Sequence, residues 1–172
     1  MNIEKPDHPS LEQHLARIQL LSLDCDGVMT DGGLYYGPTG DEMRRFNVRD
    51  GVGIKAVMAA GIEVAFITAS KTPAIQHRAR ALGVAHCITG AEDKLGALEE
   101  LCGKLGISLA DVAHMGDDIN DLPVLAKVGA PLTVADSVPD VRAVALFTSE
   151  RNGGDGAVRD ICERILAAKG VS

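Results

Sequence analysis

The chain has 172 residues, of which 46% are hydrophobic and 24% charged, a composition typical of a soluble globular protein with one substantial core. Its formal net charge is -7 and it has no cluster of lysine and arginine, so we do not expect it to bind nucleic acid. The start of the chain is polar and no apolar run is long enough to span a bilayer, which favours a cytoplasmic protein without membrane contact.

The elements expected along the chain alternate between strands and helices. Residues 1–18 should form a polar tail with a short helix over 11–18, followed by a single domain over residues 19–172. Short apolar runs without alternation, typical of strands buried on both faces, occupy residues 20–24, 62–68, 84–88, 111–116 and 130–134. Apolar residues at helical spacing predict helices over 51–60, 72–82, 92–105 and 157–168. Such alternation indicates an α/β fold with a parallel sheet covered by helices on both faces.

Residues 30–47 interrupt this alternation directly after the first strand. Residues 34–36 and 42–46 flank the turn-forming string GPTGD, which predicts a β-hairpin.

The four cysteines, Cys25, Cys87, Cys102 and Cys162, form no CxxC pair and are expected to be free thiols, as in a reducing compartment. Cys25 lies between two aspartates, and strand alternation predicts that its side chain points away from them into the core.

Polar side chains of the kinds used in phosphoryl transfer lie at the ends of successive strands. Asp24 and Asp26 follow the first strand, Thr68 ends the second, Lys94 begins a helix after the third, and Asp117 follows the fourth. Because ligands of open α/β sheets gather at the carboxyl ends of the strands, we expect these side chains to meet.

This set of residue types fits a magnesium-dependent phosphatase. Converging carboxylates from Asp24, Asp26 and Asp117 would repel one another, and a hard cation such as Mg²⁺ resolves this. Asp24 could then attack phosphorus and form an aspartyl-phosphate, with Asp26 donating a proton to the leaving alkoxide and later accepting one from water. Thr68 would hydrogen-bond a phosphoryl oxygen, and Lys94 would offset charge on the phosphoryl group and on Asp24.

Each feature alone has an ordinary explanation. A DxDG string can be a calcium loop, although that pattern requires an oxygen ligand at Val28. Thr68 alone would be a strand-end hydroxyl, Lys94 a solvated residue at a helix start, and GDD a helix cap. The order DxDG, T, K and GDDxxD, each after a successive strand, favours the phosphatase.

The strings LDCDGVMTDG, FITAS, DKLGAL and GDDINDLP resemble the four motifs of haloacid dehalogenase-like phosphatases, over nearly the whole chain after about Gln19. The resemblance implies a Rossmann-like three-layer α/β sandwich with a small β-hairpin flap and no cap domain. The roles it implies are Asp24 as nucleophile, Asp26 as general acid and base, Thr68 and Lys94 as phosphoryl ligands, and Asp24, the Asp26 backbone carbonyl and Asp117 as ligands of Mg²⁺. Asp118 or Asp121 would hold metal-bound water or Lys94.

Two further strings, RRFNVRDGVGIK and GGDGAVRD, are similar to those of 3-deoxy-D-manno-octulosonate 8-phosphate phosphatases. This resemblance implies a homotetramer whose hairpins meet at a central barrel, with the C-terminal string reaching a neighbouring active site. Arg49 and Asp50 would line the substrate end, and residues 153–159, with Arg159, would close the pocket.

The second motif departs from the Thr-Gly-Arg often found in this family, because Thr68 is followed by Ala69, Ser70 and Lys71. These three residues are predicted to bind substrate, but the missing arginine removes an anion contact, and whether Lys71 replaces it stays open. The resemblance implies an eight-carbon sugar-acid 8-phosphate as the substrate, and the departure in the second motif leaves a nine-carbon sialic-acid-type 9-phosphate as the alternative.

Two other classes of protein compete with this hypothesis. A phospho-accepting receiver domain also combines acidic residues, threonine and lysine, but here the DxD pair lies on the first strand and includes a hydrolytic acid and base. A non-catalytic relative of a nucleotide-sugar synthetase domain is disfavoured by the complete set of motifs.

Overall fold

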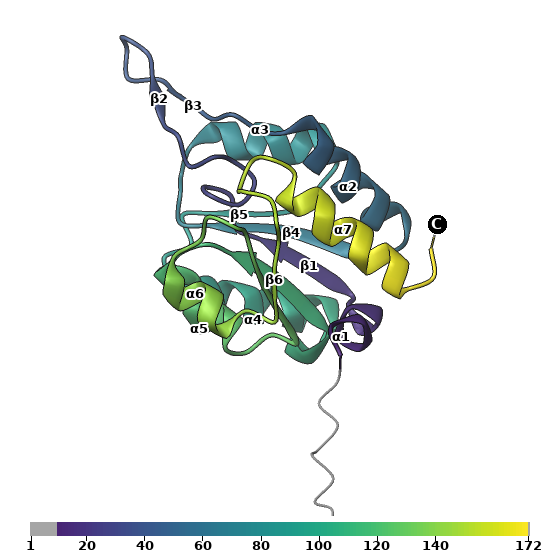
Figure 1. The fold of residues 1–172 in the computed structure, drawn as a ribbon. Helices are drawn as coiled ribbons and strands as arrows, with labels where there is room; N and C mark the ends of the chain where they lie inside the picture. The colour runs from purple at the N-terminus through teal and green to yellow at the C-terminus, as the bar shows by residue number, and fades with distance from the viewer. Residues whose placement is uncertain (1–9, 172) are drawn as a thin grey trace, which may run out of the picture.

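The computed structural model describes residues 10–171, which form a six-stranded sheet between two layers of helices (Figure 1). The tail expected over residues 1–9 lies outside the described residues. No helix in the described part of the chain combines the length and apolarity needed to cross a membrane.

All pairings in the main sheet are parallel, and the spatial order of its strands is β5-β4-β1-β6-β7-β8. The strands are β1 (Leu20–Leu23), β4 (Glu63–Thr68), β5 (His86–Thr89), β6 (Val112–Gly116), β7 (Ala130–Thr133) and β8 (Phe147–Thr148). The five predicted strands are confirmed with small shifts of their ends. The two-residue edge strand β8 was not predicted, because so short a segment has no recognisable pattern.

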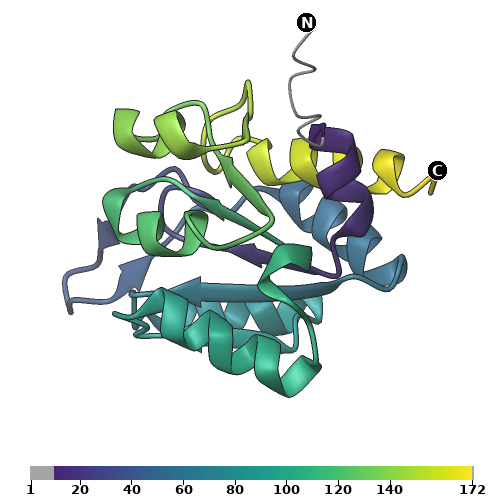
Figure 2. The ribbon, with the colours of Figure 1, turned by 90° about the horizontal axis from the view of Figure 1, so that it is seen from below.

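The helices are α1 (Leu11–Arg17), α2 (Val48–Ala59), α3 (Pro73–Leu82), α4 (Lys94–Leu105), α5 (Leu122–Leu125), α6 (Pro139–Val144) and α7 (Ala157–Ala168), with short 3-10 helices η1 (Leu109–Asp111) and η2 (Ile119–Asp121). Helices α1, α2, α3 and α7 share one hydrophobic core with the sheet, while α4 and α5 share another on the opposite face (Figure 2). The predicted three-layer α/β sandwich is therefore confirmed.

Strand β4 illustrates why the predicted strands lack polar alternation. Val64 and Phe66 point into the core under α2 and α7, whereas Ala65 and Ile67 point into the core under α4. Successive side chains of a strand face opposite sides of a sheet, so a strand covered on both sides needs apolar residues at every position.

Helix α2 begins three residues earlier than the sequence pattern predicted. The helix starts at Val48 because Asn47 caps it, with the Asn47 side-chain oxygen accepting a hydrogen bond from the Arg49 N–H at 2.8 Å. Asparagine is among the preferred residues at this position, since its side chain satisfies an N–H group that the first turn leaves free.

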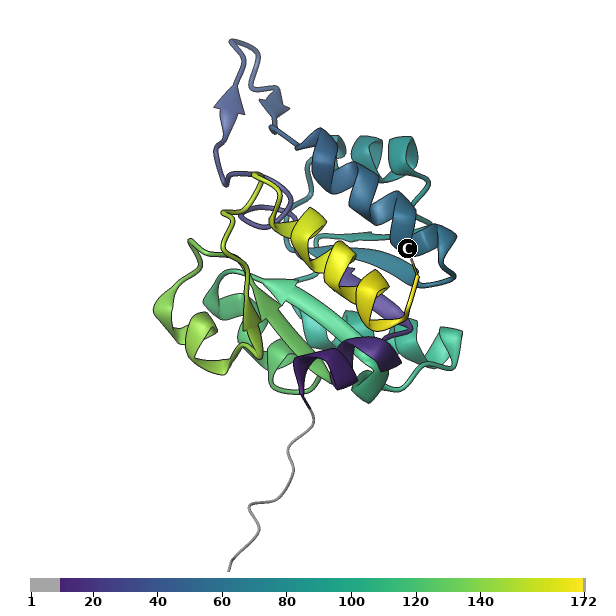
Figure 3. The same ribbon diagram turned by 45° about the vertical axis from the view of Figure 1, so that its right-hand side comes forward.

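The hairpin projects from the carboxyl edge of the sheet (Figure 3). Its strands β2 (Tyr35–Tyr36) and β3 (Glu42–Met43) pair antiparallel, which confirms the predicted hairpin with shorter strands. An isolated bridge between Thr30 and Phe46 closes its base. Within residues 10–171 the structure has no separate cap domain, so this hairpin is the flap expected from the resemblance.

Candidate active site

The carboxyl ends of three neighbouring strands bring the predicted site residues together. Strand β1 lies between β4 and β6, where the strand order changes direction, and this is where open α/β sheets bind ligands. Asp24 follows β1, Thr68 ends β4, and Asp117 follows β6. The Asp24 N–H donates to the Met115 carbonyl oxygen at 3.0 Å, which extends the pairing of β1 and β6 up to the site.

Lys94 links two buried carboxylates at this edge of the sheet. Its Nζ lies 3.0 Å from Asp24 Oδ1 and 2.7 Å from Asp121 Oδ1. The lysine is the first residue of α4, whose N-cap Asp93 accepts a hydrogen bond from the Gly96 N–H. Because the side chain is 1% exposed, its ammonium group is held by these two carboxylates rather than by solvent.

A buried hydrogen-bonded chain continues from Asp121 into the sheet. His114 Nε2 donates to Asp121 Oδ1 at 3.2 Å, and His114 Nδ1 lies 3.0 Å from the Ser22 Oγ. The other oxygen of Asp121 accepts hydrogen bonds from the backbone N–H groups of Asp117 and Asp118, at 3.1 and 3.5 Å. Asp121 is thus fixed from several sides and in turn orients Lys94, which was one of the two roles anticipated for it.

Asp24, Asp117 and Asp121 each offer a carboxylate oxygen, and these oxygens lie within 4.8 Å of one another. The backbone makes room for this group at Gly27, which has a φ of 88° and whose missing Cβ would occupy the position of the Asp117 carboxylate. Only glycine tolerates both the backbone conformation and this close approach.

The pKa values of the group reflect three acids compensated by one ammonium. Burial, together with the charges of Asp24 and Asp121, raises the pKa of Asp117 to about 8, and burial with the charge of Asp121 also raises the pKa of Asp24. Burial acts in the same direction on Asp121, but the hydrogen bond from His114 and the charge of Lys94 outweigh it and lower its pKa to about 2. For Lys94, burial acts to lower the pKa, but Asp24 and Asp121 outweigh it and raise the value.

These residues fit a magnesium ion. Opposite oxygen ligands of Mg²⁺ are roughly 4 Å apart, close to the spread of this carboxylate group. The raised pKa of Asp117 indicates that its charge is not compensated by the described residues alone, and a divalent cation would supply the missing positive charge.

The Asp26 side chain does not belong to this carboxylate group. Its Oδ1 accepts a hydrogen bond from Arg44 Nε at 2.7 Å, which directs it toward the hairpin. The predicted metal contact of Asp26 concerns its backbone carbonyl and stays a prediction. Cys25, between the two aspartates, is fully buried in the core, as strand alternation predicted.

Thr68 is buried and its hydroxyl has a free donor. Its Oγ1 accepts a hydrogen bond from the Ser70 N–H at 3.2 Å, so the hydroxyl proton can be directed to another acceptor such as a phosphoryl oxygen. Ala69 and Lys71 are exposed beyond the strand end.

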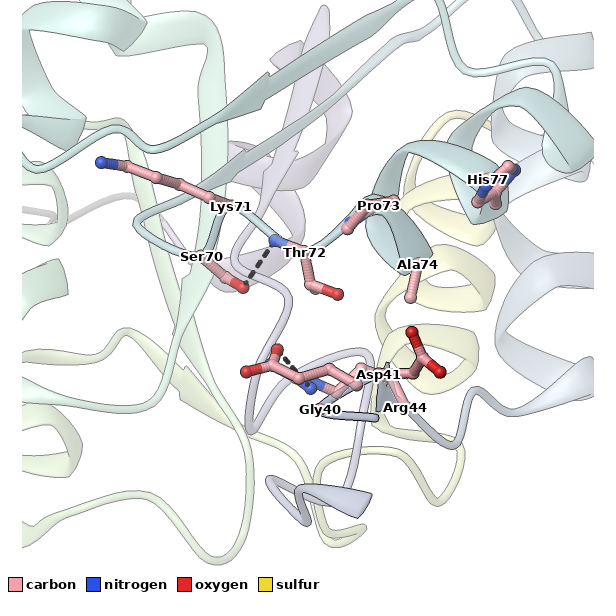
Figure 4. Close-up of a pocket in the computed structure, with 10 residues that line it drawn as sticks. Gly40, Asp41, Arg44, Ser70, Lys71, Thr72, Pro73, Ala74 and His77 are labelled. Atoms are coloured by element: carbon pink, nitrogen blue, oxygen red, sulfur yellow. Dashed lines mark hydrogen bonds and ion pairs between the residues drawn. The ribbon is translucent and has the colours of Figure 1, made fainter. Parts of the chain in front are cut away.

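A cleft of about 720 Å³ separates this strand end from the hairpin and is lined in part by Arg44, Ser70, Lys71 and Thr72. In the close-up of this cleft, the Lys71 side chain extends away from the other labelled side chains (Figure 4). Its carbon atoms lie beside Gly90, where a Cβ would meet them. The replacement of the missing arginine by Lys71 stays a prediction.

The other predicted substrate residues, Arg49, Asp50 and Arg159, lie on helices α2 and α7. Arg49 and Arg159 line a separate cleft of about 430 Å³ between α2 and α7. Asp50 is buried, and its Oδ1 accepts a hydrogen bond from the Arg159 N–H at 2.8 Å. Within one chain, the structure does not bring these three residues to the carboxylate group.

The first part of the GGDGAVRD segment packs against its own chain. The Gly154 N–H donates to the Val28 carbonyl oxygen at 3.0 Å, and a Cβ at Gly153 would collide with the backbone of Gly27. The loop after β1, which carries Asp24 and Asp26, is thereby supported by the C-terminal segment.

Sequence reasoning assigned no role to two residues that contact the site, Arg44 and His114. Alternation in the expected second hairpin strand could have identified Arg44, because residues 42, 44 and 46 of a strand must share one face. The other residue is His114. It lies two residues before Gly116 on the same face of β6, from which a short loop leads back to Asp121.

Comparisons with known proteins agree with this geometry. A family model described as haloacid dehalogenase-like hydrolase matches residues 87–161. The chain is 42% identical over 165 residues to the 3-deoxy-D-manno-octulosonate 8-phosphate phosphatase KdsC of Salmonella typhimurium, which covers 96% of this chain and 88% of the relative.

Solved structures give the same result. The phosphatase of this name from Moraxella catarrhalis, in complex with magnesium, phosphate and a KDO molecule, superposes with a TM-score of 0.91 at 39% identity, covering 93% of this chain and 92% of the other. The cobalt-bound enzyme from Haemophilus influenzae gives a TM-score of 0.89 at 36% identity, covering 92% of each chain. This chain therefore belongs to the haloacid dehalogenase-like hydrolases and, within them, to the 3-deoxy-D-manno-octulosonate 8-phosphate phosphatase family.

Proposed function

We propose that this protein is a magnesium-dependent phosphatase that hydrolyses 3-deoxy-D-manno-octulosonate 8-phosphate to the free sugar acid and phosphate. The observation that carries the proposal is the contact of Lys94 with Asp24 beside Asp117, at the strand ends where the phosphatase-like motifs of this chain fall. The Moraxella relative, which is described as binding magnesium, phosphate and KDO, supports the same substrate class.

In the first half of the reaction, the Asp24 carboxylate attacks phosphorus and the bond from phosphorus to the sugar oxygen breaks. Lys94 and the Thr68 hydroxyl offset the charge on the phosphoryl oxygens. Asp26 gives its proton to the leaving alkoxide, so that the sugar acid departs as an alcohol.

In the second half, Asp26, now a carboxylate, takes a proton from a water molecule as that water attacks the phosphorus of the aspartyl-phosphate. The bond between phosphorus and Asp24 breaks, phosphate leaves, and both aspartates regain their starting protonation states. When bound, Mg²⁺ would be held by Asp24, Asp117 and the Asp26 carbonyl and would neutralise charge on the phosphoryl group.

A panel of phosphate esters tests this function. Phosphate release is measured with Mg²⁺ on the eight-carbon sugar-acid 8-phosphate, a nine-carbon sialic-acid-type 9-phosphate, hexose phosphates and nucleotides. We expect kcat/KM to be highest for the eight-carbon compound. A preference for the nine-carbon compound would instead assign the alternative substrate, and equal rates on all compounds would contradict a dedicated sugar-acid phosphatase.

We also propose that the protein assembles as a homotetramer through its hairpins. Support comes from apolar side chains that are exposed on the hairpin and the start of α2, namely Leu34, Tyr35, Tyr36, Met43, Val48 and Val52. Side chains of this size are rarely exposed in such a cluster unless a partner covers them. Arg49 and Arg159 line a different cleft from Ser70, which supports a role for them at the active site of a neighbouring subunit.

The assembly makes a prediction for hairpin variants. Tyr35→Glu places a charge in the proposed interface and is expected to shift the protein to smaller species in size-exclusion chromatography with light scattering, because burying an unpaired charge is costly. The matched control is Val144→Glu on α6, another exposed apolar residue, 48% accessible, that should leave the assembly unchanged. A wild-type protein that is monomeric would contradict the proposed tetramer.

Two further features complete the proposal. We propose that residues 19–172 form one domain to which α1 also belongs, because Leu15 and Ile18 are buried in the core that α7 shares. We also propose a cytoplasmic location, which the four free cysteines support, since a reducing compartment keeps thiols unpaired.

A further inference from the structure

Side chains on the second half of the hairpin alternate between two faces. Met43 and Arg45 are exposed, whereas Glu42, Arg44 and Phe46 are partly buried on the opposite face. The Arg44 side chain is only 3% exposed, although the hairpin projects from the body of the protein. An arginine that is withdrawn from solvent to this degree requires charged partners close by.

Arg44 has two such partners. Its Nη1 lies 3.2 Å from Glu42 Oε2 on the hairpin itself, and its Nε donates to Asp26 Oδ1 at 2.7 Å on the loop after β1. Burial acts to lower the pKa of Arg44, but the two carboxylates outweigh it and raise the value, so the guanidinium stays charged. The short contact with Asp26 is therefore a charge-assisted hydrogen bond.

The base of the hairpin is fixed beside that loop. Thr30 pairs with Phe46 across the base, and the Thr30 hydroxyl oxygen accepts hydrogen bonds from the N–H groups of Gly27 and Gly32, both at 3.2 Å. Arg44 lies two residues before Phe46, so its position relative to Asp26 is set by backbone pairing and not only by its own side chain.

Arg44 also lies on the side of the site where the cleft opens. Arg44 lines the 720 Å³ cleft together with Ser70 and Thr72, which follow the phosphoryl-binding Thr68 (Figure 4). Asp26, which contacts Arg44, keeps 31% of its side chain exposed, so its carboxyl group is not sealed from solvent.

We propose that Arg44 is a positioning residue for the proton transfer from Asp26 to the departing sugar oxygen. The Arg44 N–H needs an acceptor, so Asp26 Oδ1 serves as that acceptor and the transferred proton is carried by Oδ2. The hydrogen bond also holds the carboxyl group beside Arg44, which itself lines the cleft. This inference rests on the proposed function, because it assigns Arg44 a role in that reaction.

The dependence on the leaving group distinguishes this role from a merely structural one. In the first turnover of Arg44→Met, we expect release of the sugar acid from 3-deoxy-D-manno-octulosonate 8-phosphate to slow by about 10- to 100-fold. This is part of the roughly 10²- to 10⁴-fold that a general acid contributes, because Asp26 itself is kept and only its positioning is lost. Release of p-nitrophenolate from p-nitrophenyl phosphate should stay within about threefold of the wild type, because this stable anion leaves without a proton. First-turnover rates are used because the later attack of water is common to both substrates.

The hairpin offers a matched control in Arg45→Met. Arg45 is the next residue, faces the other side and pairs with Asp31 at 3.3 Å with its side chain 54% exposed. The same substitution there should leave both first-turnover rates unchanged, and thermal unfolding checks that all three proteins are folded.

Equal slowing of both substrates by Arg44→Met, or no slowing of either, would overturn the positioning role. If the wild type does not hydrolyse the octulosonate phosphate at all, the proposed function fails. In that case the first-turnover rates of the wild type and Arg44→Met are compared on the alkyl phosphate of the panel that the wild type hydrolyses fastest. A failure of the proposed substrate is thereby distinguished from a failure of the positioning role.

Discussion

The Asp24→Asn variant is expected to lose phosphate release in the presence of Mg²⁺, with kcat lowered by at least roughly 10⁴-fold. An amide has nearly the shape of a carboxylate but is a poor nucleophile, so the chemistry is removed while the packing around residue 24 is kept. Asp24 is 5% exposed and contacts Lys94, so the substitution also removes one buried charge from an acidic group.

Two measurements accompany this result. Mass spectrometry of acid-quenched wild-type protein during turnover should reveal a phosphoryl adduct on Asp24, and the variant should lack it. The matched control is Asp140→Asn, the same substitution at an exposed residue of α6, which should retain activity within about twofold, as surface substitutions usually do. Turnover that persists in Asp24→Asn would rule out this residue as the nucleophile.

The strands of the main sheet were predictable because burial on both faces leaves a simple pattern. Mainly apolar runs such as residues 20–23 and 112–115 are best explained as buried strands. An aspartate shortly after each run, Asp24 or Asp117, indicates where the carboxyl end of the strand lies. The order of the strands was not predictable in this way, because the pattern gives no information about which strands pair. That order places β1 between β4 and β6 and so decides which strand ends can share a ligand.

The site residues also differ in how far the sequence could predict them. Asp24, Lys94 and Asp117 were identified from motif order, and the structure brings them together, while their catalytic roles remain predictions for the experiments above. Contacts that depend on pairs distant in the sequence were not foreseen. The hydrogen bond from Arg44 to Asp26 joins two segments through a hairpin whose inward face depends on register, and a one-residue slip would have directed Arg45 inward instead.

A second prediction concerns Asp117, whose carboxylate is expected to have opposite effects on activity and on the stability of the metal-free protein. In EDTA near pH 8, we expect Asp117→Asn to raise the free energy of unfolding by about 1–3 kcal/mol, which corresponds to roughly 3–9 °C in Tm. The reason is that the substitution removes one of three carboxylates that repel one another. The expected gain is modest because Asp117 is partly exposed and solvent screens its charge.

The pH dependence of this gain follows from the direction of the pKa shift. Folding raises the pKa of Asp117 from 3.8 to about 8, so the folded state holds the proton more tightly than the unfolded state. Its contribution to stability is complete below about pH 4 and is lost as the pH rises toward 8. Without metal, the difference in Tm between Asp117→Asn and the wild type should therefore be small at pH 4 and largest near pH 8.

With Mg²⁺ present, the wild type is expected to have the higher Tm of the two proteins. A ligand that binds only the folded state stabilises it by about 4.1 kcal/mol at 1,000 times its dissociation constant, more than the about 1–3 kcal/mol that the variant gains without metal, and the wild type gains this fully while Asp117→Asn gains little. Phosphate release by the variant should fall by at least about 100-fold, because a metal ligand is lost. Differential scanning calorimetry with EDTA and with Mg²⁺ measures the change in Tm, and a phosphate-release assay measures the loss of activity, with Asp140→Asn again as the matched control. If Mg²⁺ stabilises Asp117→Asn as strongly as the wild type, Asp117 is not a metal ligand, and the raised pKa reflects burial and neighbouring carboxylates alone.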